Sequence, residues 1–303
     1  MALKAIKSKI RATVRTGKVT KAMEAVSAVK MRKSQERALA GRAYARSALR
    51  ILARVSATQE GLRHAFATKR EGARHLFVVV TSDKGLAGSV NSAVLKLLEG
   101  KIRGESKENL SFITFGRKAT DYLTTRGYTV LRSYLNVRDD VALPEMQEVV
   151  ALATGAFLAN ECDRVSIVYQ NFISTFEQKP QVHQLLPLAA DSFATIVAGI
   201  APTRGVLADT AGERPVPYYT VEPNAEEVTA ALVPRLLAVM VYHALLESKA
   251  SEHSARMVAM KNATDKAKEM TKLLTIRFNK ERQAVITREV SEITGGIEAM
   301  AQG

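Results

Sequence analysis

Both ends of the chain lack proline over long distances, which permits helices far longer than those of an ordinary globular domain. Residues 1–50 and 235–303 contain no proline, and the second stretch is dominated by Ala, Met, Leu, Lys, Glu and Arg, which cost least in a helix. In the first stretch, an apolar stripe with helical spacing contains Leu3, Ile6, Ile10, Val14, Val19, Met23, Val26 and Val29. This stripe predicts an amphipathic helix over residues 3–57, roughly 80 Å long.

The second long helix is expected from residue 224 to about residue 300, on the order of 115 Å if unbroken. Two acidic residues, Glu226 and Glu227, suit the positive end of its dipole. We expect Pro234 to kink the helix, because a proline ring removes one backbone hydrogen bond and clashes with the preceding turn. The glycines at 295–296 mark its expected fraying end.

The two long helices should pack against each other, because a lone helix of such length is marginal in water without packing. In the last stretch, the spacing of a coiled-coil seam is followed by Met257, Met260, Thr264, Ala267, Thr271, Leu274, Phe278, Glu281 and Val285. Such a small and partly polar seam would hold two helices only weakly, which indicates that further protein surrounds the pair. Since a compact region separates the helices, we expect them to fold back antiparallel as a shaft.

The middle of the chain alternates short runs of β-branched and aromatic residues with helix-compatible stretches. The runs are Leu76–Thr81, Leu110–Phe115, Thr129–Leu135 and Val165–Ile173, and the stretches are Ser92–Arg103, Arg117–Arg126 and Glu145–Glu161. This alternation predicts parallel strands joined by crossover helices. The predicted fold is therefore a central α/β (Rossmann-like) domain with a mostly parallel sheet, plus a long antiparallel coiled coil of the N- and C-terminal helices.

Three domains are expected on this basis. Residues 1–70 form the N-terminal shaft helix, residues 71–222 the central α/β domain, and residues 223–303 the C-terminal shaft helix. The stretch Gly199–Glu222, which contains several prolines and glycines, is expected to be a loop that links the central domain to the last helix.

Few residues carry the chemistry of an active site. The only cysteine, Cys162, excludes an intramolecular disulfide and any multi-cysteine metal motif, and the five histidines lack metal-ligand spacing. We assign no catalytic, cofactor-binding or metal-binding residue. Apolar runs such as Leu76–Val80 fall far short of the roughly 20 residues that span a membrane, so no membrane insertion is expected. The basic N-terminus is interpreted as mature protein rather than a transit peptide, because its helical pattern continues past Glu24.

The loop Thr81–Asn91, with the sequence TSDKGLAGSVN, lies between a predicted strand and a predicted helix, where glycine-rich loops often bind phosphate. It lacks the glycine spacing of both common nucleotide-binding motifs. Gly85 and Gly88 are better explained by a tight turn, with Ser89 or Asn91 near the helix cap. A dinucleotide-binding enzyme is therefore only the third hypothesis.

The positive charge is concentrated at the N-terminus. Residues 1–50 hold fourteen Lys and Arg against Glu24 and Glu36, a net charge of +12 out of +14 for the whole chain. A nucleic-acid-binding coiled coil is the main alternative, although Tyr44 is the only aromatic residue in this stretch and no basic block precedes a separate zipper. The other interpretation is a positive rod inside a sleeve of acidic protein surfaces, where charge steers and orients the partners.

Three stretches of the chain resemble the gamma-subunit family of rotary proton-translocating ATP synthases. They are VTKAMEAVSAVKMRKSQ at 19–35, SDKGLAGSVN at 82–91, and a third over 251–296 that includes SEHSARMVAMKNATDKAKEM and FNKERQAVITREVSEITGG. The first and third are highly specific, whereas the region between them matches in layout more than in letters.

The resemblance implies a non-catalytic rotor subunit without a cofactor. In this family the shaft fills the cavity of a hexamer of alpha and beta subunits, and its foot contacts the epsilon subunit and the membrane rotor ring. Rotation of the asymmetric shaft couples that ring to conformational cycling of the beta subunits. The implied location is peripheral, on the cytoplasmic face of the bacterial inner membrane, with no nucleic-acid partner.

The resemblance also implies partner contacts. Hydrogen bonds from the shaft to loops of the hexamer are expected of Arg256, Arg282 and Gln283. Arg32 and Lys33 are expected to face acidic loops on beta. The remaining expected contacts are made by Thr287 and Glu289, near the level where Met23 should pack across from the N-terminal helix.

Some positions depart from the family pattern. The central loop has Ala87 and Ser89 where relatives often carry Cys and Gly. Cys162 is alone and no chloroplast-type dithiol insert is present, so thiol regulation of that kind is excluded. Pro234 is unexpected near the start of the last helix and puts the straightness of the lower shaft in question.

Overall fold

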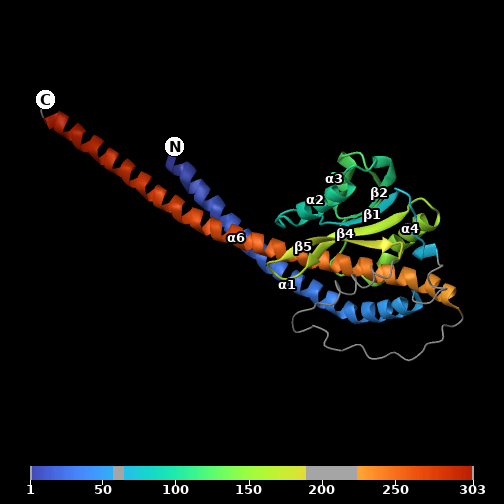
Figure 1. Ribbon diagram of the computed structural model, residues 1–303. Helices are drawn as coiled ribbons and strands as arrows, with labels where there is room; N and C mark the ends of the chain where they lie inside the picture. The colour runs from blue at the N-terminus through green and yellow to red at the C-terminus, as the bar shows by residue number, and fades with distance from the viewer. Residues whose placement is uncertain (1, 57–64, 189–223, 302–303) are drawn as a thin grey trace. The chain divides into compact units, whose positions relative to one another are not determined.

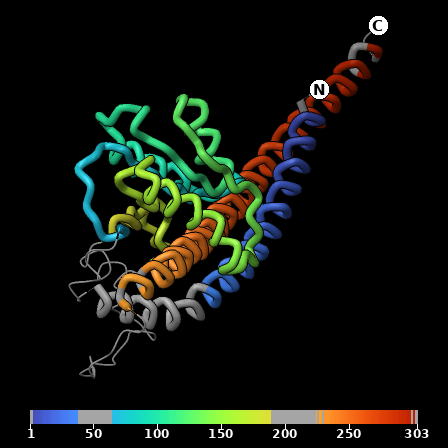
Figure 2. The backbone as a smooth tube through the Cα atoms, turned by 90° about the vertical axis from the view of Figure 1, so that its right-hand side faces the viewer, coloured from blue at the N-terminus to red at the C-terminus, as the bar shows by residue number. Residues whose placement is uncertain are grey.

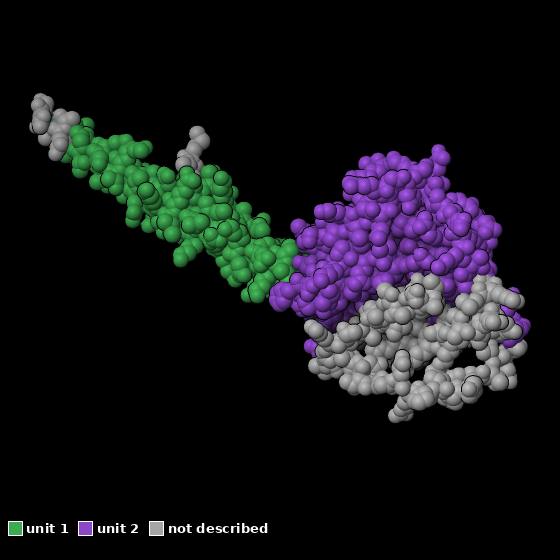
Figure 3. Space-filling model, in the orientation of Figure 1, with its two compact units in different colours: residues 1–27, 256–303 green, residues 28–255 purple. Residues whose placement is uncertain are grey.

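The computed structural model describes residues 2–56, 65–188 and 224–301, so the predicted loop Gly199–Glu222 lies outside the described residues. The chain forms two compact units, coloured separately in Figure 3: unit 1 contains residues 1–27 and 256–303, and unit 2 contains residues 28–255. Two helices contribute to both units, α1 (Ala2–Ser56) and α6 (Ala225–Ala301). Both predicted long helices are confirmed.

Unit 2 is built on a five-stranded sheet with the order β3-β2-β1-β4-β5. The strands are β1 (His75–Val80), β2 (Leu110–Phe115), β3 (Thr129–Tyr134), β4 (Arg164–Phe172) and β5 (Gln178–Leu186). The first four run parallel, and β5 is antiparallel to β4. The predicted mostly parallel sheet is confirmed (Figure 1).

Helices cover both faces of the sheet, which is why β1 is apolar and buried from Leu76 to Val80. Phe77 and Val79 of β1 share one apolar core with residues of α2 (Val90–Ile102) and α3 (Arg117–Thr125). The alternate residues Leu76, Val78 and Val80 share the other core with α4 (Gln147–Leu158) and α6. Short 3-10 turns complete the described elements: η2 (Ala65–Ala67), η3 (Lys107–Asn109) and η4 (Leu143–Met146).

The strand β5 is missing from the sequence prediction. It reads QKPQVHQLL and contains Pro180, and neither its polarity nor its proline suggests a strand. At the edge of a sheet a proline is tolerated, because one side of the strand has no neighbour to receive a hydrogen bond from it. The prediction therefore missed β5 because this segment is a strand by virtue of its place at the edge of the sheet. Local composition does not reveal that place.

The first part of α6 is a core helix. Asn224 Oδ1 accepts a hydrogen bond from Glu227 N at 2.8 Å, and the Asn224 amide returns one to the Glu227 carboxylate, a reciprocal cap of the kind that begins helices. The helix includes an apolar window long enough to cross a membrane, but more than half of that window is buried inside the protein. Its buried apolar residues between Val233 and Leu245 belong to the core beneath the sheet.

α6 continues without a break through Pro234 and past both glycines to Ala301. The expectation that the helix frays at 295–296 was therefore wrong. A glycine costs only about 1 kcal/mol in a helix interior relative to alanine, which is too little to end a helix by itself.

Unit 1 is a pair of antiparallel helices, formed by the first part of α1 and the last part of α6 (Figures 1 and 2). Thr20 and Thr264 share a hydrogen bond between their hydroxyls at 2.7 Å, and a Cβ built on Gly17 would lie 3.3 Å from Cβ of Ala267. From the first contact to the second, the residue number falls by three on α1 and rises by three on α6, so the two helices run in opposite directions. The predicted antiparallel coiled coil is confirmed.

Candidate partner-binding surface

The seam of unit 1 is narrow and partly polar. On α6, all nine residues predicted for the seam, from Met257 to Val285, are buried or half-buried, while most residues between them are exposed. On α1 the seam passes through Gly17, Thr20 and Ser27, of which the last two are at most 8 % exposed. Small residues at these positions let the two helix backbones approach closely.

The apolar stripe predicted for α1 is only partly correct. Leu3, Ile6 and Ile10 do face the seam, since they are buried or half-buried, but the valines beyond them do not. Val14, Val19, Val26 and Val29 are between 40 % and 57 % exposed. The seam uses the small residues one position away from these valines, because only small side chains fit at the close approach near Gly17.

Large apolar side chains therefore point outward along unit 1. Besides the valines Val14, Val19 and Val26 of α1, the residues of α6 that are at least 50 % exposed include Leu273, Ile276, Ile286, Val290, Ile293 and Ile297. Single exposed apolar residues are normal on a protein surface, whereas a dense array of them marks an interaction site. Sequence reasoning missed this surface because it assigned the valines to the seam.

Cations accompany the apolar residues on α1. Lys4, Lys7, Arg11, Lys18 and Lys21 are exposed, and none of them forms an ion pair with another part of the described chain. Since α1 has no acidic residue before Glu24, this helix presents positive charge and apolar side chains together. Such a surface suits a partner that is acidic and partly apolar.

The structure separates the eight predicted contact residues into two groups. Arg32 and Lys33 lie in unit 2 and are exposed, with Arg32 Nε 3.0 Å from Glu36 Oε1 one helical turn away. The other six lie in unit 1. Met23 is half-buried and Arg256 is only 8 % exposed. The other four residues are exposed: Arg282, Gln283, Thr287 and Glu289.

The predicted level of Met23 is wrong. The contacts of Gly17 with Ala267 and of Thr20 with Thr264 place Met23 opposite residues 260–261 of α6. Arg282 lies about 30 Å further along the helix at 1.5 Å per residue. Met23 is therefore near Arg256 rather than near Thr287 and Glu289.

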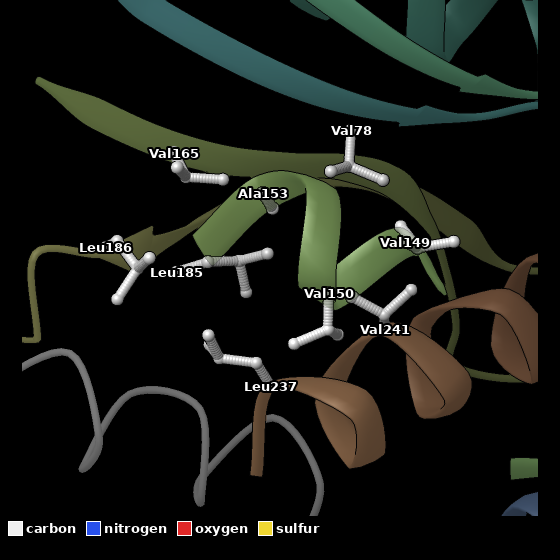
Figure 4. Close-up of a pocket in the computed structure, with 9 residues that line it drawn as sticks. All are labelled: Val78, Val149, Val150, Ala153, Val165, Leu185, Leu186, Leu237 and Val241. Atoms are coloured by element: carbon white, nitrogen blue, oxygen red, sulfur yellow. The ribbon is translucent and has the colours of Figure 1, made fainter. Parts of the chain in front are cut away.

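The crevice where α/β folds usually bind nucleotides, at the carboxyl ends of neighbouring parallel strands, is filled by α6. Thr81 and Gly116, which follow β1 and β2, face Ser248, Lys249 and Glu252 of α6 across a cavity of about 20 Å³. A second cavity of about 10 Å³ lies deeper (Figure 4), with the apolar lining Val78, Val149, Val150, Ala153, Val165, Leu185, Leu186, Leu237 and Val241. Neither has room for more than one or two water molecules, so a nucleotide does not fit in either.

The loop 81–91 is braced by its own side chains. Asn91 Oδ1 accepts a hydrogen bond from Ser82 N at 2.9 Å, and the Asn91 amide donates to Ser82 Oγ at 2.8 Å. Ser89 is the N-cap of α2, but its side chain makes no capping bond. As expected, the loop is a tight turn, with left-handed backbone at Leu86 and Gly88. These bonds account for Ser82 and Asn91 without a phosphate ligand.

The single cysteine has the properties of an unreactive thiol. Cys162 is buried, and burial raises the pKa of its thiol to about 11. It therefore stays protonated near neutral pH, where the thiolate would be the reactive form.

Comparisons with known proteins agree with this architecture. A protein-family model described as ATP synthase matches residues 2–300. The ATP synthase gamma chain of Pelotomaculum thermopropionicum is 37% identical over 298 residues, which cover 98% of this chain and 99% of the relative. That of Symbiobacterium thermophilum is 38% identical over 299 residues, 98% of each chain.

Among solved structures, the Euglena gracilis mitochondrial ATP synthase (OSCP/F1/c-ring, rotational state 3) contains a chain with a TM-score of 0.66 and 20% identity, covering 99% of this chain and 94% of that chain. A chain of the Tetrahymena thermophila mitochondrial ATP synthase central stalk and c-ring has a TM-score of 0.57 and 26% identity, covering 81% and 99%. From the family match, the near-complete coverage of its relatives and the shared fold, we conclude that the chain belongs to the family of ATP synthase gamma chains.

Proposed function

We propose that this chain is the central rotor shaft of a proton-translocating ATP synthase, which couples rotation of a membrane ring to conformational cycling of the catalytic beta subunits. The observation that carries the proposal is the inverted packing of unit 1. Small and polar residues such as Gly17 and Thr264 occupy the seam, while large apolar residues such as Leu273 and Val290 are exposed. A helix pair built to stand alone would have the opposite arrangement.

In this proposal, residues 1–70 and 223–303 form the shaft, and residues 71–222 form the domain at its foot. The shaft occupies the cavity of a hexamer of alpha and beta subunits, and the foot contacts the epsilon subunit and the membrane ring. The chain is non-catalytic and peripheral, on the cytoplasmic face of a bacterial membrane. We do not retain the nucleic-acid-binding alternative, because the relatives of this chain belong to a rotary enzyme.

The chemistry of coupling follows from asymmetry. A single shaft inside a threefold ring presents a different face to each beta subunit, so the three nucleotide sites are not equivalent at any moment. The shaft must bind the alternative beta conformations with different affinities, because a contact that is equal in all of them shifts no population. Exposed apolar and cationic side chains on different sides of unit 1 can supply such differences.

The proposed contact residues fit this role to different degrees. Arg282 and Gln283 are exposed and available to hydrogen-bond to loops of the hexamer, as are Thr287 and Glu289. Arg32 and Lys33 are exposed and face acidic loops of beta in the proposal. Arg256 is buried within the chain, so we assign it to supporting the surface near Met23.

Truncation tests the proposed function. A chain that ends after Phe278 loses the exposed apolar residues from Ile286 to Ile297, together with the last two seam residues Glu281 and Val285, but keeps the seam from Met257 to Phe278. We expect the assembled complex in membrane vesicles to hydrolyse ATP with little proton pumping, measured as acidification per ATP consumed. A chain that ends after Ala301 is the control and should pump normally. Normal pumping by the shorter chain, or failure of the full chain to co-purify with a hexameric ATPase, would contradict the proposal.

A charge at the seam tests the partner surface. Met23→Lys should impair coupling by creating an ionic contact to beta, because Met23 is half-buried at the edge of the helix pair. Met23→Gln keeps a similar side-chain length without the charge and should retain coupling. Equal proton pumping per ATP in the wild type and the lysine variant would refute this role.

A further inference from the structure

The loop between β3 and η4, residues 135–142, is held by both terminal helices through one carboxylate. Asp139 Oδ2 lies 2.8 Å from Nζ of Lys30 on α1. Its other oxygen, Oδ1, lies 3.0 Å from Nε2 of His253 and 3.4 Å from Nζ of Lys249, both on α6. All of these residues belong to unit 2.

Backbone atoms of the same loop receive further hydrogen bonds from the helices. Lys249 Nζ donates to the carbonyl of Val137 at 2.7 Å, and Arg37 of α1 donates to the carbonyl of Asp139. Lys30 and Arg37 are two helical turns apart, and Lys249 and His253 are one turn apart, so each helix presents one face to the loop. The loop thus has four side-chain attachments to two helices.

The opposite side of the loop is fixed to the α/β domain. Val141 is 3 % exposed and belongs to the core beneath the sheet, and Val137 packs against the same core. Ala142 N donates to Glu145 Oε1 at 2.8 Å, which ties the end of the loop to η4. The loop is therefore a short bridge from the sheet to the two long helices.

Asp139 is the shared acceptor for two buried donors. The side chains of Lys249 and His253 are only 10 % and 5 % exposed, and a buried ammonium group or imidazole N–H needs a nearby acceptor. The hydrogen bond from His253, followed by that from Lys30, holds the pKa of Asp139 well below its usual range against the opposing effect of partial burial. The carboxylate is ionised throughout the physiological range and keeps all its contacts there.

These bonds differ in kind from the other attachments of the helices. α6 also packs on the sheet through apolar residues, but apolar packing is not directional. Among the described side chains of α1, none belongs to either apolar core. Hydrogen bonds depend on angle as well as distance, so the loop fixes how each helix is turned about its own axis.

We propose that the Asp139 loop is the joint through which torque passes between the α/β domain and both shaft helices, with Asp139 as its positioning residue. The inference rests on the proposed rotary function. Both α1 and α6 continue without interruption from unit 2 into unit 1, so a helix held against turning at Asp139 carries that constraint along its length.

The test uses Asp139→Asn in the fully assembled complex. The native Cys162 is buried, so a cysteine introduced at the exposed Glu108 can carry a probe on the α/β domain while the hexamer is fixed to a surface. In the stalled complex, we expect the variance of the probe angle to rise about twofold, because asparagine carries no negative charge and has one acceptor oxygen in place of two, so it cannot hold Lys30 together with Lys249 and His253. Proton pumping per ATP against a steep gradient should fall by a similar factor.

The neighbouring residue supplies a matched control. Asp140 has the same charge, but its side chain pairs with Arg138 of the same loop at 2.6 Å, so Asp140→Asn should leave the angular variance unchanged. Asp139→Glu keeps the charge and should restore most of the stiffness. A residue that only stabilised the fold would change the unfolding temperature without changing the variance well below that temperature.

A second variant keeps the test decisive if Asp139→Asn fails to assemble. Lys30→Gln removes only the ion pair between α1 and the Asp139 carboxylate, at a side chain that is 47% exposed. The bond from Arg37 to the carbonyl of Asp139 remains, so this variant should raise the variance by a smaller factor than Asp139→Asn. Unchanged variance in every assembled variant overturns the joint while leaving the rotary function intact. A wild-type probe that never rotates with ATP rejects the proposed function itself.

Discussion

One helix, α6, packs in two different ways along its length. Between Val233 and Leu245 its side chains enter the core beneath the sheet, where Leu236 and Leu237 are each 2 % exposed. In unit 1 the same helix meets α1 at its closest approach through Thr264 and Ala267, and several large apolar residues, such as Leu273 and Ile276, are exposed. The first part is fixed by the apolar surface that it buries within the chain. The second part is specified mainly by close approach and a few hydroxyl contacts.

This difference separates two tasks within a single element. A stretch that must stay attached to its own domain gains from deep apolar packing, about 25 cal/mol per Å² of buried apolar surface. A stretch that must present side chains to a surrounding protein keeps those residues outside the seam. The four changes that follow should have unequal effects on the two parts.

The largest effect is expected from Leu237→Ala. Leu237 is buried beneath the sheet and lines the cavity shown in Figure 4, so truncation enlarges an existing void and should cost about 3 kcal/mol. Leu273→Ala, on the same helix at 55 % exposure, should cost less than about 0.5 kcal/mol in the isolated chain. Urea titration followed by circular dichroism compares the two, and equal losses would remove the distinction.

A pH effect should be confined to the sheet. Burial, with a smaller contribution from Arg164, lowers the pKa of His75 from 6.5 to about 4. Between pH 6.5 and pH 4 the unfolded chain therefore binds a proton at His75 that the folded chain does not bind. The free energy of unfolding should fall as the pH drops from 6.5 to 4. Because His75 is partly exposed, we expect the free energy of unfolding to fall by about 2 kcal/mol.

The variant His75→Gln isolates this contribution, because the other titrating groups remain in place. Its unfolding free energy should decline less than that of the wild type between pH 7 and pH 4, as measured by urea titration at each pH. The side chains of Thr20 and Thr264 do not titrate. The exchange rates of backbone amides in this part of the seam, corrected for the intrinsic effect of pH, should therefore change little between pH 7 and pH 4. Parallel decline in both chains would exclude His75 as the cause.

A moderate effect is expected at the hydroxyl pair of the seam. Thr20→Val leaves the buried Thr264 hydroxyl with only its bond to the carbonyl of Met260, at 2.8 Å, and should cost about 1 kcal/mol. The double variant with Thr264→Val should cost less than the sum of the single changes, because no buried hydroxyl then loses its partner. Hydrogen exchange of amides in α6 measures the loss, and strict additivity would show that the pair is not coupled.

The smallest effect is expected from Gly17→Ala. Alanine should favour the helix by about 1 kcal/mol, but its methyl group would lie 3.3 Å from that of Ala267, so the helices must separate slightly. We expect these effects to offset each other to within about 0.5 kcal/mol. Gly155→Ala in α4, where no atom lies within 4 Å of the new methyl group, should stabilise the chain in thermal unfolding. A similar gain at both glycines would show that the seam has room.

The sequence was most informative where the structure of a segment depends on its own residues, through their composition or their spacing. The β-branched and aromatic runs identified two buried strands, β2 with both of its bounds and β1 to within one residue at each end. The spacing from Met257 to Val285 identified the seam of α6. The sequence was least informative where the structure of a segment depends on contacts with residues far away in the chain. The valines of α1 have the right spacing for a seam, but the partner helix selects Gly17 and Thr20 instead, and β5 is a strand only because β4 lies beside it.

The same limit applies to the functional residues. The exposed positions of Arg282 and Gln283 agree with a contact role, but the level of Met23 required the register of the helix pair. Asp139 has no local signal at all, since it lies in an ordinary charged loop. Its partners Lys30 and Lys249 are more than a hundred residues away in sequence, so only the folded chain brings them together.

The antiparallel register also determines where α1 stops supporting α6. With Thr20 opposite Thr264, the start of α1 reaches only to about Val285, and every side chain from 286 to 297 is exposed. A single helix of this length is marginal in water without packing, so the turns beyond Val285 gain no stability from α1. The stability of the tip therefore depends on whatever protein surrounds it, and conformational entropy that the tip loses on binding would reduce the affinity below the value that its contact area alone implies.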